Sequence, residues 1–126
     1  MRTAALYAGL LGLILVALSM RVSLARREAN VLLGDGDNPT LRRWVRAHGN
    51  FVEFVPLALL LLALSEHLNL GALFIHLLGL LLLLSRLAHA YALVQTDGVS
   101  AARAFGALGT LVVIGITSIY CIIAFI

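Results

Sequence analysis

The sequence predicts an all-α integral membrane protein, a single domain built as a bundle of four transmembrane helices. Apolar residues make up 62% of the 126 residues, charged residues only 12%, and the mean hydropathy is +1.05. Soluble domains are about 45–50% apolar and about 25% charged. Four apolar segments reach the roughly 20 residues that a helix needs to cross a bilayer. This composition excludes a soluble enzyme and a nucleic-acid-binding protein.

The four helices are expected over residues 4–26, 41–65, 70–94 and 101–126. The first segment is long and lacks a cleavage site of small residues, so we interpret it as a retained helix rather than a signal peptide. The run 34–40 predicts a turn, with Asn38 capping the second helix and Pro39 in its first position. Asp97 marks another turn, and Ser100 is expected to cap the fourth helix.

The arginines predict the orientation in the membrane. All nine basic residues are arginine, and only Arg2 lies away from the first and third predicted loops. The others flank those loops: Arg21, Arg26, Arg27, Arg42, Arg43, Arg46, Arg86 and Arg103. Because positive residues concentrate on the cytoplasmic side, we expect the first and third loops in the cytoplasm and both termini outside.

The second predicted helix carries a polar stripe. At 100° per residue, Arg42, Arg43, Arg46, Asn50 and Glu53 fall within about 100° of one another. Glu53 lies about two turns inside, where an unpaired charge costs about 2.5–3.5 kcal/mol or more, so it needs a partner. Arg46, Asn50 or an arginine of another helix can supply it. The stripe is either a structural ion pair that fixes helix packing or part of a functional site.

The third and fourth predicted helices add further cationic groups. Arg86 and His89 lie one turn apart near the end of the third helix, and Arg103 opens the fourth. A helix N-terminus already carries a partial positive charge, so an arginine there favours a site for an anion or a thiolate. In the alternative interpretation, Arg86 extends to the lipid headgroups and Arg103 is an anchor on the cytoplasmic side.

The remaining polar residues are expected to have packing roles. Lone Cys121 excludes a disulfide within the chain, and its apolar surroundings argue against a nucleophile. The sequence has no metal-ligand spacing. Helix packing or the membrane interface is the expected role of His67, His76, Gly106, Gly109, Thr110 and Thr117.

The run 46–56, RAHGNFVEFVP, resembles the signature of the MAPEG family, membrane-associated proteins in eicosanoid and glutathione metabolism. The family pattern is an arginine (Arg46), an asparagine four residues on (Asn50), a glutamate three further (Glu53) and then a proline (Pro56). The resemblance extends over essentially the whole chain.

Two further runs resemble particular branches of the family. Residues 86–89 are similar to the prostaglandin E synthase branch, and residues 34–36 to the small bacterial inner-membrane branch. The eicosanoid enzymes often carry a tyrosine one turn after the fourth-helix arginine, where this chain has residues 104–107, AFGA. The tyrosine-rich end of their third helix is reduced to Tyr91. These departures affect the expected identity of the second substrate and the detail of thiol activation more than the expected binding of glutathione.

The resemblance implies a homotrimer with glutathione sites between neighbouring subunits, near the cytoplasmic face. The implied glutathione-binding residues are Arg26 or Arg27, Arg46, Asn50, Glu53, Arg86 and His89. Arg103 is the implied catalytic residue, because a cation beside the sulfur favours the nucleophilic thiolate.

The implied activity is that of a membrane-bound glutathione transferase or peroxidase. Its substrates are expected to be lipophilic electrophiles or lipid hydroperoxides that enter from the membrane lipids, and its location the bacterial inner membrane. The alternative is a non-catalytic lipid-binding or scaffold protein of the same fold. A small transporter is disfavoured because no broken pair of helices is visible in the sequence.

Overall fold

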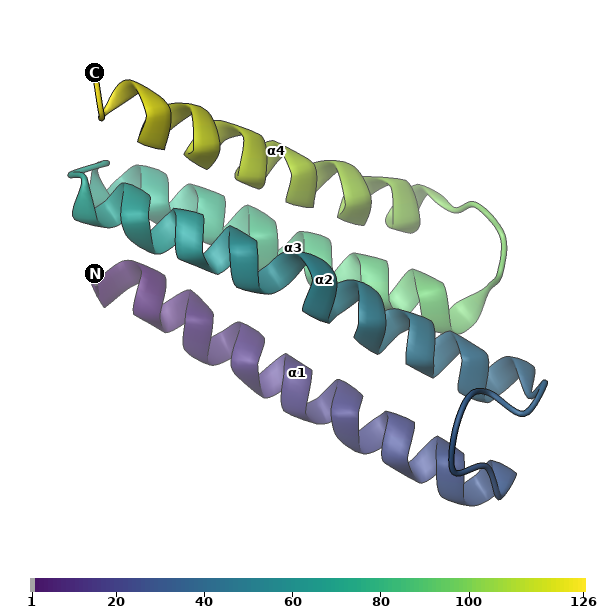
Figure 1. Cartoon of the computed structure of the whole chain (residues 1–126). Helices are drawn as coiled ribbons and strands as arrows, with labels where there is room; N and C mark the ends of the chain where they lie inside the picture. Colours follow the sequence, from purple (N-terminus) through teal and green to yellow (C-terminus); the bar gives the residue numbers. More distant parts are fainter. Residues whose placement is uncertain (1) are drawn as a thin grey trace.

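Four long helices run back and forth along one axis in the computed structural model, which describes residues 2–126 (Figure 1). They are α1 (Arg2–Ala29), α2 (Pro39–His67), α3 (Ala72–Gln95) and α4 (Ala101–Ile123). Each is long and apolar enough to cross a membrane. Residues 2–126 contain no strand. The prediction of an all-α chain with four helices able to span a membrane is confirmed.

The helix ends follow local sequence signals, with small differences from the predicted bounds. Asn38 Oδ1 accepts from the Leu41 N–H at 3.0 Å, and Ser100 Oγ accepts from the Arg103 N–H at 3.2 Å, so both predicted caps are confirmed. The first helix extends three residues beyond its predicted end, to Ala29, because Asn30 with φ 54° ends it. The fourth ends at Ile123, short of its predicted end at 126.

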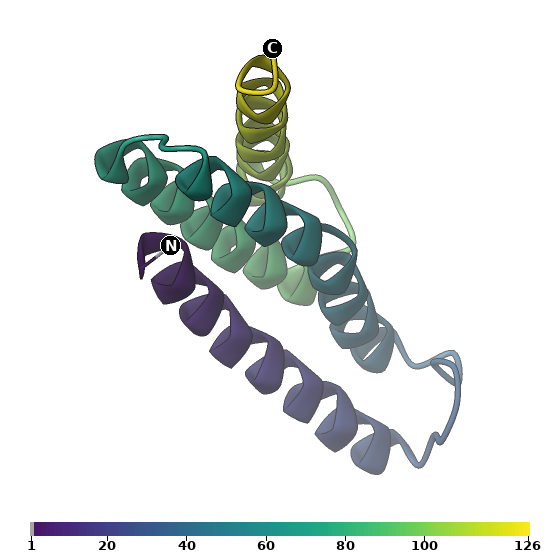
Figure 2. The same ribbon diagram turned by 60° about the vertical axis from the view of Figure 1, so that its left-hand side comes forward.

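The pair α2–α3 forms the centre of the bundle. Figures 1 and 2 place α1 and α4 on opposite sides of this pair, and within the described chain α1 and α4 do not touch. Loops 30–38 and 96–100 lie at one end of the bundle, and both ends of the chain lie at the other (Figure 1). Which end faces the cytoplasm stays a prediction.

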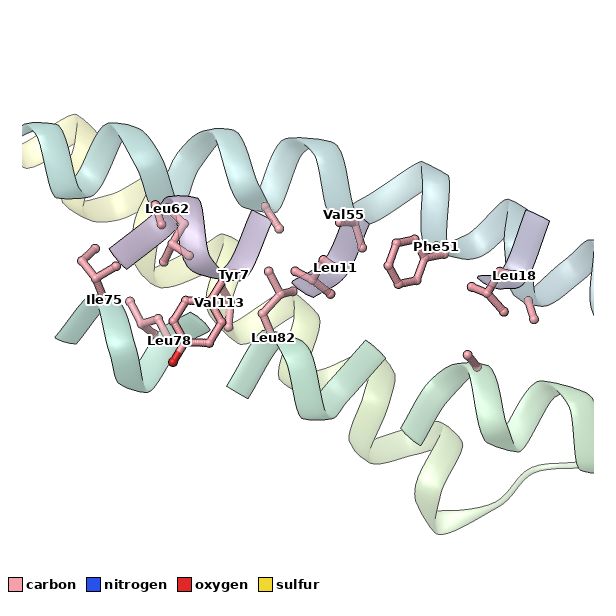
Figure 3. Close-up of a cluster of buried hydrophobic side chains, with 14 of the residues drawn as sticks. Tyr7, Leu11, Leu18, Phe51, Val55, Leu62, Ile75, Leu78, Leu82 and Val113 are labelled. Carbon is pink, nitrogen blue, oxygen red and sulfur yellow. The ribbon is translucent and has the colours of Figure 1, made fainter. Parts of the chain in front are cut away.

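Apolar side chains fill the space between the helices (Figure 3). Leu11, Leu62, Leu82 and Val113, one from each helix, are 0% exposed. In lipid, helices associate through close packing rather than through release of water, so small residues at contacts matter. Gly79 illustrates this, because a side chain there would meet the ring of Tyr7.

Polar contacts also join the helices. The Glu66 carboxylate near the end of α2 accepts from the backbone N–H groups of Thr3 and Ala4, at 3.0 and 2.8 Å. These donors have no partner within α1, and the helix N-terminus favours a negative charge. The Tyr7 hydroxyl donates to the His76 carbonyl oxygen at 3.0 Å. Both contacts attach the beginning of α1 to the α2–α3 pair.

Candidate functional site

Two hollows between α2, α3 and α4 gather most of the predicted site residues. We call them the inner hollow, of about 80 Å³, and the outer hollow, of about 210 Å³. The polar lining of the inner hollow is Asn50, Arg86, His89 and Thr110. The outer hollow is lined by Arg42, Arg43, Arg46, Thr96, Asp97 and Arg103. Asn50 and Arg46 lie one turn apart on α2, so the two hollows follow one another along the bundle.

Arg86 dominates the inner hollow. Arg86 is only 1% exposed, and this burial excludes the alternative that its side chain extends to the lipid headgroups. One terminal nitrogen donates to Asn50 Oδ1 at 2.6 Å and the other to Thr110 Oγ1 at 3.3 Å. Nε is buried without a hydrogen-bond partner. No carboxylate among residues 2–126 pairs with this guanidinium, so the inner hollow holds an uncompensated positive charge.

His89 lines the inner hollow and connects it to the beginning of α4. It is 6% exposed, and its Nδ1 lies 3.2 Å from the Arg103 carbonyl oxygen at the beginning of α4. Gly106 permits this approach of α3 and α4. A Cβ there would lie 2.5 Å from the His89 Cβ and 2.6 Å from the Ser85 carbonyl oxygen. The predicted packing role of Gly106 therefore also serves the site, because it sets the distance between its two walls.

One acidic side chain stands among the arginines of the outer hollow. Asp97 accepts two hydrogen bonds from Arg43, at 3.0 and 2.8 Å, in a bidentate ion pair. The bond from Arg43, with Arg42 and Arg103 nearby, lowers the pKa of Asp97 below its usual value. Arg103 donates to the backbone carbonyl oxygens of Asp97 and Gly98, at 3.4 and 3.3 Å. The loop 96–100 thus holds the guanidinium of Arg103, to which the family resemblance implies a role beside the thiol.

Arg42 and Arg46, two other members of the predicted stripe, differ in their contacts. Arg42 forms an ion pair with Asp35 at 2.5 Å, and this bond lowers the pKa of the Asp35 carboxyl. Arg46 is exposed in the outer hollow and has no hydrogen bond or ion pair among residues 2–126.

Glu53 does not join the hollows. It is exposed, lines neither hollow, and has no hydrogen bond or ion pair within the described chain. Neither Arg46 nor Asn50 pairs with it, because Arg46 stays apart and Asn50 accepts from Arg86. A carboxylate that lies about 20 Å along a membrane-spanning helix needs a partner. Within 2–126 the chain does not supply one, so the internal pair considered from the sequence does not form.

The arginines at the end of α1 lie elsewhere. Arg26 donates to the Gly34 carbonyl oxygen at 2.7 Å, and Arg27 is exposed. Both line a separate hollow of about 480 Å³ beside the first loop. One chain by itself therefore does not bring them to the inner or outer hollow.

Two residues of the site have roles that the sequence pattern does not indicate. The sequence predicts a packing role for Thr110, yet its hydroxyl accepts from Arg86 and donates to the Gly106 carbonyl oxygen at 2.8 Å. The sequence predicts only a turn at Asp97, yet this residue pairs with Arg43, which lies 54 positions earlier in the sequence. Among residues 2–126, no group of three or more metal-binding side chains occurs.

Comparisons with known proteins agree with this architecture. The MAPEG family model matches residues 4–123. The inner membrane protein YecN of Escherichia coli strain K12 is 38% identical over 87 residues, as is that of strain O6:H1. Each alignment covers 69% of this chain and 66% of the relative, slightly less than two thirds of its length. No solved structure matches significantly.

Proposed function

The chain belongs to the MAPEG family, and we propose that it binds glutathione and uses it on lipophilic substrates. The proposed activity is that of a membrane glutathione transferase or peroxidase, with lipophilic electrophiles or lipid hydroperoxides as second substrates. Membership in a family of glutathione and eicosanoid metabolism supports the general class, and the site residues support the choice of glutathione.

The buried guanidinium of Arg86 is the observation that carries this proposal. It lies in the inner hollow with Asn50 and Thr110 as its only hydrogen-bond acceptors in the described chain, and its charge has no carboxylate partner there. A buried charge without a counter-ion is costly, and an anionic ligand removes that cost. Glutathione has two carboxylates and one ammonium, so arginines can take the carboxylates in bidentate fashion.

The thiol chemistry is proposed for Arg103. A guanidinium beside the sulfur stabilises the thiolate, which is the nucleophile. The thiolate attacks the electrophilic carbon of a transferase substrate and the leaving group departs with its electron pair. With a hydroperoxide, the sulfur attacks the terminal oxygen and the O–O bond breaks. The alkoxide leaves and takes up the proton that the thiol released on ionisation, which gives an alcohol. A second glutathione thiol then attacks the sulfenic acid to give the disulfide and water.

We also propose that the chain assembles as a homotrimer with the site between subunits. Glu53 supports an interface, because its exposed carboxylate lies far along a membrane-spanning helix without a partner in the described chain. A neighbouring copy could bring Glu53 and Arg26 or Arg27 to the hollows of another subunit. Glu53 would then be available for the glutathione ammonium, and Arg46 and His89 for its other polar groups.

The location follows from the relatives and the arginines. The similar Escherichia coli protein is named as an inner membrane protein, which supports the same location here. The surrounding lipids then reach the open sides of the bundle and can deliver apolar substrates. The first and third loops are proposed to be cytoplasmic.

Calorimetry of the detergent-solubilised protein with glutathione tests the proposal. We expect saturable binding that Arg46→Ala weakens strongly and that the diethyl ester of glutathione, which lacks both carboxylates, does not reproduce. Arg21→Ala removes the same charge from α1 outside both hollows and is the matched control. Absence of glutathione binding to an intact, folded protein would contradict the proposal.

One observation favours a second function, a non-catalytic lipid-binding or scaffold protein. Although Arg103 lines the outer hollow, one of its terminal nitrogens is already engaged by the carbonyl oxygens of Asp97 and Gly98. In that case the polar stripe only assembles the trimer. Glu53→Gln would then dissociate the oligomer in detergent, and glutathione would have no measurable effect on native protein or variant.

Turnover separates the two functions. If Arg103 activates the thiol, Arg103→Ala leaves glutathione binding largely intact but removes the thiolate absorbance and the turnover. Normal turnover in that variant would contradict the role of Arg103, while leaving glutathione binding as a separate question.

A further inference from the structure

A third space, the α1–α3 groove, has a volume of about 480 Å³ and shares no lining residue with the inner or outer hollow. Its wall on α1 is formed by Ile14, Ala17, Leu18 and Arg21, and Trp44 of α2 closes one side. The wall on α3 runs from Leu87 through Tyr91 to Gln95. Most of this lining is apolar, and none of the predicted site residues belongs to it.

The groove has an apolar end and a polar end. The helices α1 and α3 run in the same direction (Figure 1), and each contributes an apolar residue first and a polar one last. On α1 the sequence runs from Ile14 to Arg21, and on α3 from Leu87 to Gln95. At 1.5 Å per residue, this covers about 10 Å along the bundle. The polar end therefore lies toward the loops 30–38 and 96–100.

Arg21 supplies a cation at the polar end. Its guanidinium carbon lies 4.8 Å from the centre of the Trp44 ring, a cation–π contact that holds the charge over the groove. No hydrogen bond or ion pair to Arg21 occurs among residues 2–126. Arg42 and Arg43, by contrast, are paired with Asp35 and Asp97. Arg21 thus keeps its charge available to a ligand.

We propose that the α1–α3 groove binds one anionic phospholipid, with its phosphate on Arg21 and an acyl chain along the apolar lining. The groove and the lipid are complementary, because the cationic Arg21 lies at the end where the lipid phosphate would lie and the apolar lining lies where the acyl chain would lie. A helix from a second copy fits less well, since it would bury an unpaired guanidinium. The proposal is independent of glutathione binding, which uses other residues.

The single tryptophan gives a direct probe. Trp44 is the only tryptophan of the chain and lines the groove, so its fluorescence reports what occupies this space. The protein is reconstituted in two sets of vesicles. One set contains phosphatidylglycerol brominated in its acyl chains, and the other contains brominated phosphatidylcholine at the same mole fraction. We expect stronger quenching by the brominated phosphatidylglycerol. A juxtamembrane arginine contributes about 1 kcal/mol toward anionic lipid, or about a five-fold preference.

Matched variants show whether Arg21 carries the preference. Arg21→Gln should remove it, whereas Arg27→Gln, which deletes the same charge from the same helix outside the groove, should retain it. Equal quenching by the two lipids in the native protein overturns the proposal. So does a preference that survives in Arg21→Gln, because general attraction to the basic face then explains it.

A third variant tests occupancy of the apolar end. Ala17 is exposed and lines the groove, so Ala17→Phe places a ring where the acyl chain lies. Quenching by brominated phosphatidylglycerol should fall in this variant while the protein stays folded by circular dichroism. If neither lipid quenches native Trp44, a second copy or another segment covers the groove and the proposal is wrong. Glutathione calorimetry on Arg21→Gln reports separately on the proposed function.

Discussion

Arg86 combines an almost complete burial with the lack of a carboxylate partner among residues 2–126. A buried arginine retained only for stability is expected to have a counter-ion, because desolvation of the charge costs several kcal/mol. The Phe51 ring, 5.8 Å from the guanidinium carbon, compensates only a part of that cost. At the scale of the residue, stability and ligand binding therefore make opposite demands on this position.

Arg86→Met separates these demands. Methionine fills a similar volume without a charge, so the ligand-free protein should be as stable as the native protein or more stable. Glutathione binding should fall about ten-fold or more, since charge-assisted hydrogen bonds are lost. Thermal unfolding in detergent and calorimetry measure the two effects. Strong destabilisation together with unchanged binding would assign Arg86 a structural role instead.

At the scale of the element, the contact of α3 with α4 depends on Gly106. Any added Cβ meets the backbone carbonyl of Ser85 and the Cβ of His89, which cannot move aside without shifting a helix. We expect Gly106→Ala to lower the free energy of unfolding by about 1–3 kcal/mol. Gly115 lies on the same helix with nothing within 4 Å, so Gly115→Ala is the matched control and should be neutral or slightly stabilising. Equal effects of the two substitutions would contradict this explanation.

The loop 96–100 is attached to α2 by a contact that depends on pH. Arg43 lowers the pKa of Asp97 below its usual 3.8, so the pair stabilises the fold above that value. The stabilisation is lost as the pH falls through the lower value of the folded state. Asp97→Asn should therefore be less stable than the native protein at neutral pH, and the difference should shrink as the pH falls below 3.8. Unfolding curves across this range measure the difference, and a difference that persists in acid would exclude the pair as its cause.

Helix positions could be predicted from local sequence, but helix partners could not. Asn38 and Ser100 cap their helices as predicted, since a cap needs only residues three positions apart. The bonds from Arg86 to Asn50 and Thr110 join three helices, and no periodicity within one helix contains that information. The stripe on α2 placed Asn50 and Glu53 together, yet Asn50 lines the inner hollow and Glu53 does not.

At the scale of the whole molecule, the orientation in the membrane remains to be measured. Three single-cysteine variants in a Cys121→Ser background report on the three connections between helices. They carry Leu32→Cys, His67→Cys or Val99→Cys, all at exposed positions. A membrane-impermeant maleimide added to intact cells should label only the cysteine at position 67. Labelling at 32 and 99 should require permeabilised membranes, because the arginine-rich side is expected in the cytoplasm. The reverse pattern would invert the proposed topology.

The membrane class, the number of helices, their caps and the family could all be predicted from the amino-acid sequence. These properties depend on composition, on apolar length and on residues close together in the chain, which are visible without a fold. Only the tertiary structure shows that Arg86 is buried, that Asp97 pairs with Arg43, and that Glu53 and Arg26 line neither the inner nor the outer hollow. These outcomes depend on how α2, α3 and α4 approach one another, and that approach is set by contacts such as Gly106 against His89 that join positions distant in sequence.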